Sequence, residues 1–338
     1  MTFDVTKRAM SRAPRIEFEG ALYHLMARGD RREAIFQGDN DRLKFLEYLE
    51  EGADRYGVQI HCYVLMGNHF HLVVTTPKAN LSKWMHQLKT AYTVYFNRRH
   101  GMVGHLFQGR FKSIVVEAES YLLELSRYLH LNPVRGQPTG EGTPEERREH
   151  LRSYPWSSYR GYAGLGKTKR FVNSQAIEGV FKSYTGQEWN PNQYRRWVEE
   201  GLVKELDDPF EAVKWQQVLG DEDFLQQIKD RWNQKTSKPE VYTQKRAWSA
   251  ELGVEGILKK VTKHFGIKTK EILDRGDRNN AARRFAMVLC WDLSGMSHRE
   301  IANLFGAPSS NSVAQMIRRT KQGESRTLAI LRSKLCHK

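Results

Sequence analysis

The sequence predicts an α+β domain, built on an antiparallel sheet, followed by a basic all-α domain. Two apolar, β-rich runs at residues 58–66 and 69–75 are separated by Gly67-Asn68, a pair typical of a tight hairpin turn. Strand-like and helix-periodic segments alternate up to residue 131, whereas the segments after residue 253 have helical periodicity alone. The length of 338 residues allows two or three hydrophobic cores.

The elements of the first domain follow one another as strand, helix, strand, strand, helix, strand and helix. An apolar run forms the first strand, and the turn Arg28-Gly29-Asp30 ends it. The next apolar residues recur at helical spacing until Gly57, after which the two hairpin strands follow. In order, the expected ranges are 21–27, 40–56, 58–66, 69–75, 81–99, 106–116 and 119–131.

The second and third helices fix the topology. The aromatic and leucine spacing of 81–99 predicts a helix that ends at Gly101, and the helix at 119–131 ends before Pro133 because the residue before a proline disfavours helix. The resulting β-α-β-β-α-β order is that of ferredoxin-like folds, with an antiparallel sheet and helices on one face. Its two central strands would be the first strand and the strand that carries His69 and His71.

Composition indicates a partner and a compartment. The net charge is +15, and residues 251–338 hold 17 lysines and arginines against 8 acidic residues, a surplus that attracts polyanions such as nucleic acid. No run approaches 18 consecutive apolar residues, and the basic start of the chain lacks the apolar stretch of a secretory signal. The three cysteines are far apart, as expected of reduced thiols. We therefore expect a cytoplasmic, nucleoid-associated protein.

Two histidines on the second hairpin strand are candidate metal ligands. Side chains alternate along a strand, so His69 and His71 share one face while Phe70 points the other way. Two imidazoles at this spacing can bind one divalent ion. For an isolated pair of this kind, a packed histidine beside a solvated one is the more common explanation, so the metal hypothesis needs further ligands from elsewhere in the chain.

The helix at 119–131 offers those partners. Asn132 lies one helical turn after Tyr128, on the same face, so it could supply an oxygen ligand while the phenol stands beside the metal. A phenol has a pKa of about 10 and attacks a phosphodiester only when a cation or a base helps it to ionise. Tyr121, two turns before Tyr128, is an alternative nucleophile, although no ligand follows it at one turn.

Several ordered motifs resemble those of the single-tyrosine HUH transposases, and more narrowly the REP-associated tyrosine transposases. They are the runs at 63–72, 107–113 and 127–135, with Arg-Gly-Asp at 28–30 upstream and Trp-Ser-Ser-Tyr-Arg at 156–160 downstream. The resemblance implies cleavage and rejoining of single-stranded DNA near hairpins through a 5′-phosphotyrosine. It also implies that Mg²⁺ or Mn²⁺ is the cofactor.

Site residues carry over from these motifs one by one. The resemblance implies that His69, His71 and Asn132 bind the metal and that Tyr128 is the nucleophile. DNA contacts are expected from basic residues near the site. Arg110 and Lys112 would contact phosphates from a strand that leads towards the catalytic helix. Arg residues after the first strand could read hairpin or flanking bases, and the two that we assign are Arg28 and Arg31.

The C-terminal region resembles domain IV of the bacterial replication initiator DnaA, a Trp-repressor-like helix-turn-helix domain. The matching stretches are 261–267, 281–287 and 300–306, whereas 309–312 reads Ser-Ser-Asn-Ser and departs from the initiator's signature. The resemblance implies sequence-specific binding of duplex DNA but not the initiator's target. The expected base contacts are Ser309, Ser310, Asn311 and Gln315, and the expected phosphate contacts are Arg283, Arg318 and Arg319.

The sequence thus predicts a transposase domain at 14–165, a helical connector at 166–250 and a DNA-binding domain at 251–325. The expected partners are single-stranded DNA hairpins and flanking duplex DNA, for a monomer or a homodimer, with no membrane. Two other functions fit the same motifs: a catalytically silent DNA-binding regulator and an HUH nickase that does not transpose.

Overall fold

The computed structural model describes residues 15–135, 142–204, 206–235, 253–274, 280–294, 296, 298–323, 328 and 331. They form two compact units. The sheet unit spans Glu17–Leu225, and the helical unit consists mainly of the described residues from Gln226 onward. The predicted connector is divided between the two units at residue 225, and its residues 236–250 lie outside the described part, as do 251–252 and 324–325 of the predicted last domain.

The sheet unit is built on a five-stranded sheet in the order β2-β3-β1-β4-β5. The strands are β1 (Ala21–Arg28), β2 (Gln59–Leu65), β3 (His69–Thr76), β4 (Lys112–Val116) and β5 (Val218–Leu219). β1 to β4 pair antiparallel, which confirms the predicted arrangement, and β1 and β3 are adjacent inner strands as expected. β5 is a parallel addition to β4 that the sequence did not indicate.

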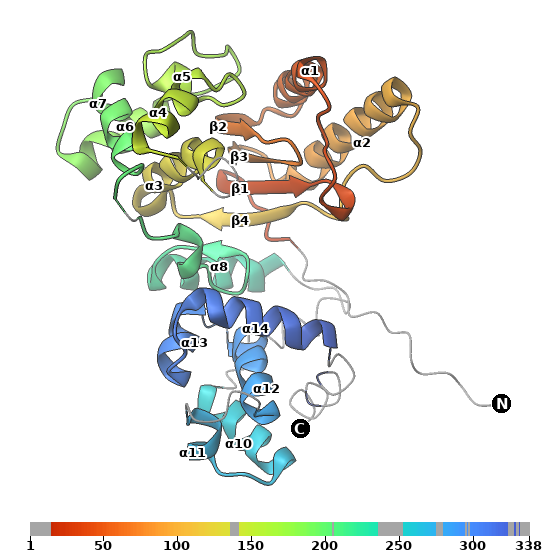
Figure 1. Ribbon diagram of the computed structural model, residues 1–338, viewed down its shortest axis with the longest axis vertical. Helices are drawn as coiled ribbons and strands as arrows, with labels where there is room; N and C mark the ends of the chain where they lie inside the picture. The colour runs from red at the N-terminus through yellow and green to blue at the C-terminus, as the bar shows by residue number, and fades with distance from the viewer. Residues whose placement is uncertain are drawn as a thin grey trace. The chain divides into compact units, whose positions relative to one another are not determined.

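The two faces of the sheet have different partners because side chains alternate along each strand. Phe70 points to one face, where it packs on Phe45 of α1 (Asp39–Tyr56). α2 (Leu81–His100) lies beside α1 (Figure 1). His71 points to the other face, and α3 (Ala118–Leu131), whose Tyr128 reaches the same side, packs on β2 and β3. Helices therefore cover both faces, not one face as predicted.

The helices that follow α3 are η2 (Asn132–Val134), α4 (Pro144–Ser153), α5 (Tyr159–Tyr162), α6 (Gln175–Thr185), α7 (Pro191–Glu200), η3 (Pro209–Ala212) and α8 (Glu222–Lys235), which crosses the boundary between the two units. Among them η2, α6, α7 and η3 pack on α3. Buried His130 of α3 lies 2.8 Å from the Tyr194 hydroxyl of α7 and 2.8 Å from the Ser158 hydroxyl. Arg152 forms a two-fold ion pair with Glu199, with both N···O distances at 2.7 Å. The segment after residue 165 is thus part of the unit that holds α3.

The described elements of the helical unit confirm the predicted all-α character. They are α10 (Val254–Phe265), α11 (Thr269–Leu273), α12 (Ala281–Leu289) with a π-helical extension at Cys290–Ser294, α13 (His298–Phe305) and α14 (Ser310–Gly323). Ile257, Phe285, Ile301 and Ile317 are among the residues that bury its core. α13 and α14 are joined by a short turn that begins at Gly306, whose φ of 60° suits glycine. This is the predicted helix-turn-helix pair.

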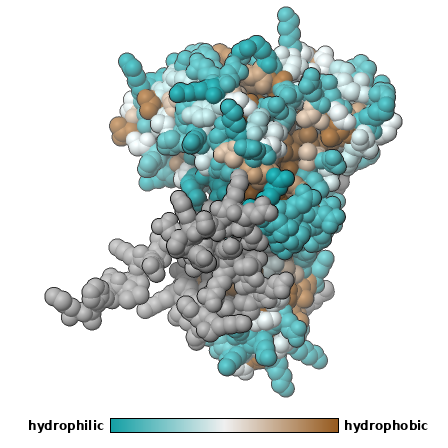
Figure 2. All heavy atoms as spheres, turned by 180° about the vertical axis from the view of Figure 1, so that it is seen from behind, coloured by the Kyte–Doolittle hydropathy of each residue, from teal (hydrophilic) through white to brown (hydrophobic). Residues whose placement is uncertain are grey.

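The surface matches the basic, polar composition. Hydrophilic side chains dominate the described surface in Figure 2. Across the described part of the chain, no helix combines the length and the apolar character that crossing a bilayer requires.

Candidate metal and nucleophile site

The predicted histidine pair lies on one face of β3. The ring centroids of His69 and His71 are 5.1 Å apart, and the rings are inclined by 80°. A metal–nitrogen bond of about 2.1 Å places an ion about 3.2 Å from each ring centre, so two imidazoles at 90–110° around it would be separated by about 4.5 to 5.2 Å. The observed separation therefore fits two ligands of one ion.

The first histidine is held by the hairpin turn. Nδ1 of His69 lies 2.6 Å from Oδ1 of Asn68, and Nδ2 of Asn68 donates to the Arg32 carbonyl at 2.9 Å. The loop after β1 is itself fixed to the turn, because the Gly29 amide donates to the Asn68 carbonyl and the Ile35 amide to that of Gly67. His69 thus keeps Nε2 as the ring nitrogen for a metal.

The second histidine has a histidine neighbour from the adjacent strand. Nδ1 of His71 lies 2.8 Å from Nε2 of His24 on β1, and their rings stack at 5.1 Å. Both side chains are buried. Nε2 is thus the ring nitrogen of His71 that this contact does not engage.

Burial and nearby cations keep these histidines neutral, the form that binds metals. Burial lowers the pKa of His24 to about 3, and Lys112 acts in the same direction. Burial and then Arg28 lower the pKa of His69 to about 4. The pKa of His71 is well below its usual value, because of burial and then its histidine neighbours and the same two cations.

Tyr128 lies on this face, and one aromatic side chain packs between it and His24. The ring of Phe210, from η3, is 4.9 Å edge-on from Tyr128 and 4.6 Å from His24. The Arg135 guanidinium lies 4.9 Å from the centre of the phenol ring. Burial raises the pKa of Tyr128 to about 12, with a further contribution from Asp208, while Arg135 lowers it.

Asn132 follows one turn later, where α3 passes into η2. Its Nδ2 donates to the carbonyls of Tyr128 and Leu129, at 3.0 and 3.4 Å, so Oδ1 is the amide atom left to accept or to bind a cation. The described residues contain no cluster of three His, Cys, Asp or Glu side chains suited to a metal. The role of the Asn132 amide as third ligand stays a prediction.

The rival nucleophile stands in different surroundings. Burial raises the pKa of Tyr121, and so do the nearby carboxylates of Glu117 and Asp221. Anionic neighbours oppose both ionisation of the phenol and the approach of a phosphate. Tyr128 also has an anionic neighbour, Asp208, so the difference between the two phenols is the cation Arg135, which lowers the pKa of Tyr128 alone.

The basic candidates of the sheet unit occupy different positions. Arg28 ends β1 opposite His69, and its buried Nε has no hydrogen-bond partner among the described residues. Arg31 is exposed in the following loop, with a φ of 50°. Lys112 begins β4, whereas Arg110 lies in the loop before it. The predicted strand at 106–116 was thus too long, since Gly109 with φ 63° breaks it.

The helical unit corrects one assignment. Arg283 was expected to contact phosphate, but it is 9% exposed and donates to the carbonyls of Ile272 (2.9 Å) and Phe305. It joins α11, α12 and α13, so it is a structural residue.

The remaining candidates lie at the start of α14 and along it. Oγ of Ser309 accepts from the Ser312 amide at 3.1 Å, which caps the helix. Asn311, Gln315, Arg318 and Arg319 are exposed and follow one another at helical spacing, so they share one face. Ser310, the first residue of the helix, is half-buried.

Sequence reasoning missed four residues of the site. Asn68 and Arg135 stand inside the motifs but were given no role, and His24 lies in a strand whose pairing the sequence does not reveal. Phe210 comes from a segment without a motif, so no signal pointed to it.

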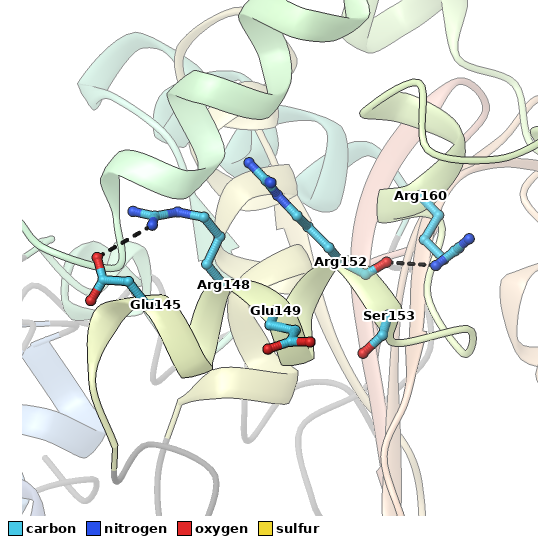
Figure 3. A pocket seen from close by; sticks show the side chains of 6 residues that line it. All are labelled: Glu145, Arg148, Glu149, Arg152, Ser153 and Arg160. Carbon is cyan, nitrogen blue, oxygen red and sulfur yellow. Dashed lines mark hydrogen bonds and ion pairs between the residues drawn. The ribbon is translucent and has the colours of Figure 1, made fainter.

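A surface hollow of about 400 Å³ lies on α4, apart from the histidine pair (Figure 3). Within it Arg148 pairs with Glu145, and Arg160 donates to the Arg152 carbonyl at 2.6 Å. Arg148 and Arg152 also pair with Glu199 of α7. These charges hold helices together, and the hollow is no part of the candidate site. Its lining residues are Glu145, Arg148, Glu149, Arg152, Ser153 and Arg160.

Two comparisons relate part of the chain to known transposases. Residues 17–132 match the family model described as "Transposase IS200 like". No curated protein matches the chain. A solved structure titled "Structure of the REP associates tyrosine transposase bound to a REP hairpin" is 16% identical, with a TM-score of 0.38, and the match covers 48% of this chain and 92% of that chain. Residues 17–132 are therefore similar to the IS200-like transposases.

Proposed function

We propose that the chain is a metal-dependent DNA strand transferase that cleaves and rejoins single-stranded DNA near hairpins. The observation that carries the proposal is the placement of Tyr128 on the sheet face where His69 and His71 both leave Nε2 free. The narrower assignment to REP-associated tyrosine transposases rests on the sequence motifs.

Tyr128 is the proposed nucleophile. Its phenolic oxygen attacks the phosphorus of one phosphodiester and loses its proton, while the bond from phosphorus to the 3′-oxygen breaks and that oxygen takes up a proton. The product is a 5′-phosphotyrosine and a free 3′-hydroxyl. A 3′-hydroxyl of another DNA end can then attack the phosphotyrosine and restore the phenol, so no hydrolytic water is required.

His69, His71 and Asn132 would hold Mg²⁺ or Mn²⁺ beside this phenol. A bound divalent ion polarises the phosphate and offsets negative charge in the transition state. A basic side chain of the protein would also favour ionisation of the phenol. Arg135 lies over the Tyr128 ring and favours the phenolate, whose formation burial otherwise opposes.

DNA would approach the site over basic residues. Arg28, with its unpaired Nε, is suited to bind a phosphate oxygen beside His69. Arg31, Arg110 and Lys112 would contact the flanking backbone, and all three are exposed. These basic side chains would therefore bind the DNA backbone on the sheet face that carries His69 and His71.

The α13–α14 pair would bind duplex DNA. The exposed face of α14 presents Asn311 and Gln315 to base edges and Arg318 and Arg319 to phosphates. Ser309 and Ser310 at the start of the helix complete the proposed base contacts. The cytoplasmic, nucleoid-associated location and the bounds 14–165 and 251–325 of the first and last domains are part of the same proposal, whereas residues 166–225 belong to the sheet unit.

A covalent adduct tests the proposal. The full chain is incubated with labelled single-stranded hairpin DNA and Mg²⁺ or Mn²⁺, and a protein–DNA species that survives denaturation is expected. The adduct should be absent in Tyr128→Phe and after chelation with EDTA, and it should persist in Tyr121→Phe. Duplex binding without any adduct would instead identify a silent regulator. Cleavage without transfer to a second DNA end would identify a nickase.

A further inference from the structure

We propose that Asn68 and His24 are positioning residues that place the proton of His69 and His71 on Nδ1, so that both rings offer Nε2 to the same cation. The inference rests on the proposed metal centre and assigns roles to two residues that the motifs leave without one. It follows from the hydrogen bonds of Asn68 in the hairpin turn and from the contact of His24 on β1 with His71.

The orientation of the Asn68 amide determines the protonation of His69. Nδ2 of Asn68 donates to the Arg32 carbonyl, which can only accept. Oδ1 is therefore the atom that lies 2.6 Å from Nδ1 of His69, and because it is an acceptor, that ring nitrogen must carry the proton. A neutral imidazole has one N–H, so Nε2 of His69 keeps a lone pair for a metal.

The backbone of the loop after β1 supports this arrangement. Arg31 and Arg32 both have positive φ, 50° and 68°, a conformation that costs free energy for residues with a side chain. The loop is held in it by hydrogen bonds to the hairpin turn, such as that from the Gly29 amide to the Asn68 carbonyl at 2.8 Å. The result is an Arg32 carbonyl placed to fix the Asn68 amide.

His24 can do the same for His71. Their 2.8 Å contact leaves two tautomeric arrangements. If His24 donated, His71 would carry its own proton on Nε2 and could not bind a metal. If His71 donates from Nδ1, His24 accepts with Nε2 and the free nitrogen of His71 is a ligand. Metal binding therefore selects the arrangement in which His24 is the acceptor.

Phe210 covers His24 on the side of Tyr128, with the two rings 4.6 Å apart. His24 is 4% exposed and its side chain makes its one hydrogen-bond contact within the described part of the chain to His71, so its orientation depends on this packing and on His71. A buried partner of this kind typically changes metal affinity 10–100-fold when it is removed.

Mn²⁺ affinity of the full chain tests the proposal, measured by electron paramagnetic resonance of the free ion. Asn68→Ala and His24→Leu should each weaken binding about 10–100-fold. His24→Gln keeps an acceptor oxygen at this position and should recover most of the affinity.

His61→Leu is the matched control. His61 is also buried, and its nitrogens contact the Thr75 hydroxyl at 2.8 Å and the Asn173 carbonyl at 3.1 Å. It has no contact with the histidine pair among the described residues. His61→Leu should lower thermal stability and leave Mn²⁺ affinity unchanged, which separates positioning from a general loss of folding.

Nitrogen NMR of the imidazoles gives a readout that needs neither metal nor activity. The metal-free chain should show the His69 resonance, assigned by its loss in His69→Gln, as the Nδ1–H tautomer. An Nε2–H tautomer for His69 would overturn the inference. Wild-type Mn²⁺ binding with unchanged affinity in Asn68→Ala and His24→Leu would overturn it while the metal centre stands. Absence of Mn²⁺ and Mg²⁺ binding by the wild type would overturn the metal centre and this inference together.

Discussion

At the scale of single residues, the site is defined by which atom each side chain leaves available. His69 and His71 engage Nδ1 and leave Nε2, and Asn132 engages Nδ2 and leaves Oδ1. Tyr128, unlike these three residues, is not in the form that its proposed role requires, because burial raises the pKa of its hydroxyl to about 12 and keeps it protonated. Its environment must change, or a cation must be added, before the phenolate becomes common at neutral pH.

Phe210 is the residue through which that environment can be altered. Replacing its ring, 4.9 Å from Tyr128, with alanine should hydrate the phenol and lower its pKa from about 12. Ultraviolet difference titration between pH 9 and 11.5 measures this, with the double variant Phe210→Ala/Tyr128→Phe as the reference for all other tyrosines. An unchanged Tyr128 signal would show that Phe210 does not control access of water to the phenol.

The residue scale also shows where sequence reasoning succeeds and fails. The alternation of side chains along β3 correctly placed His69 and His71 on one face, because that periodicity is local. The contact between His24 and His71 depends on the register of two strands nearly 50 residues apart, which no local pattern reveals. Arg283 was misassigned since a sequence shows a charge but not its burial.

At the scale of elements, α12 and α14 use their arginines in opposite ways. Arg283 of α12 is buried and donates to two backbone carbonyls, whereas Arg319 of α14 is exposed. Removing buried donors leaves carbonyls without partners, while removing an exposed cation changes mainly the interaction with polyanions.

A pair of substitutions separates these roles. Arg283→Gln should lower the free energy of unfolding by about 2–4 kcal/mol, because two buried carbonyls lose a charged donor. Arg319→Gln should leave that free energy within about 0.5 kcal/mol and reduce the salt dependence of duplex binding by about one counterion. Urea unfolding and binding titrations at several salt concentrations measure both. Equal stability of the two variants would contradict the structural role of Arg283.

The order of elements was predictable because hairpin, helix and proline signals are local. The β-α-β-β-α-β order is confirmed on that basis, and helices α13 and α14 lie where helices were predicted, whereas their helix-turn-helix role stays a prediction. β5 and η3 were not predictable, since a two-residue strand has no periodicity and its pairing with β4 is made across about 100 residues. Through these two elements the segment after α7 reaches the candidate site.

At the scale of the whole molecule, the sheet unit buries several histidines in neutral form. Burial lowers the pKa of His24 and of His130 to about 3, and it also lowers the pKa of His61 and His71. In the unfolded chain a histidine takes up a proton below about pH 6.5. In the folded chain the same histidine stays neutral until the pH approaches its lower folded-state pKa. The contribution of these histidines to the free energy of unfolding is therefore fully present above pH 6.5 and decreases as the pH falls below it.

Acid should therefore begin to weaken the fold at a pH where most carboxylates are still ionised. Between pH 6.5 and pH 5, His24 and His130, each with a pKa of about 3, should each reduce the free energy of unfolding by about 1.6 kcal/mol. Urea unfolding of the full chain at the two pH values checks this, and His130→Gln should show a smaller difference than the wild type. A free energy of unfolding that is constant over this interval would contradict the neutral, buried state of these side chains.

The most direct test of the account is to locate the DNA adduct on the chain. After reaction with single-stranded hairpin DNA and Mn²⁺, nuclease trimming and trypsin digestion leave Tyr121 and Tyr128 on separate peptides, 113–127 and 128–135, because cleavage follows Lys112, Arg127 and Arg135. Mass spectrometry should find the nucleotide mass on peptide 128–135 alone. A nucleotide on peptide 113–127, or on neither, would contradict the assignment of Tyr128 as the nucleophile.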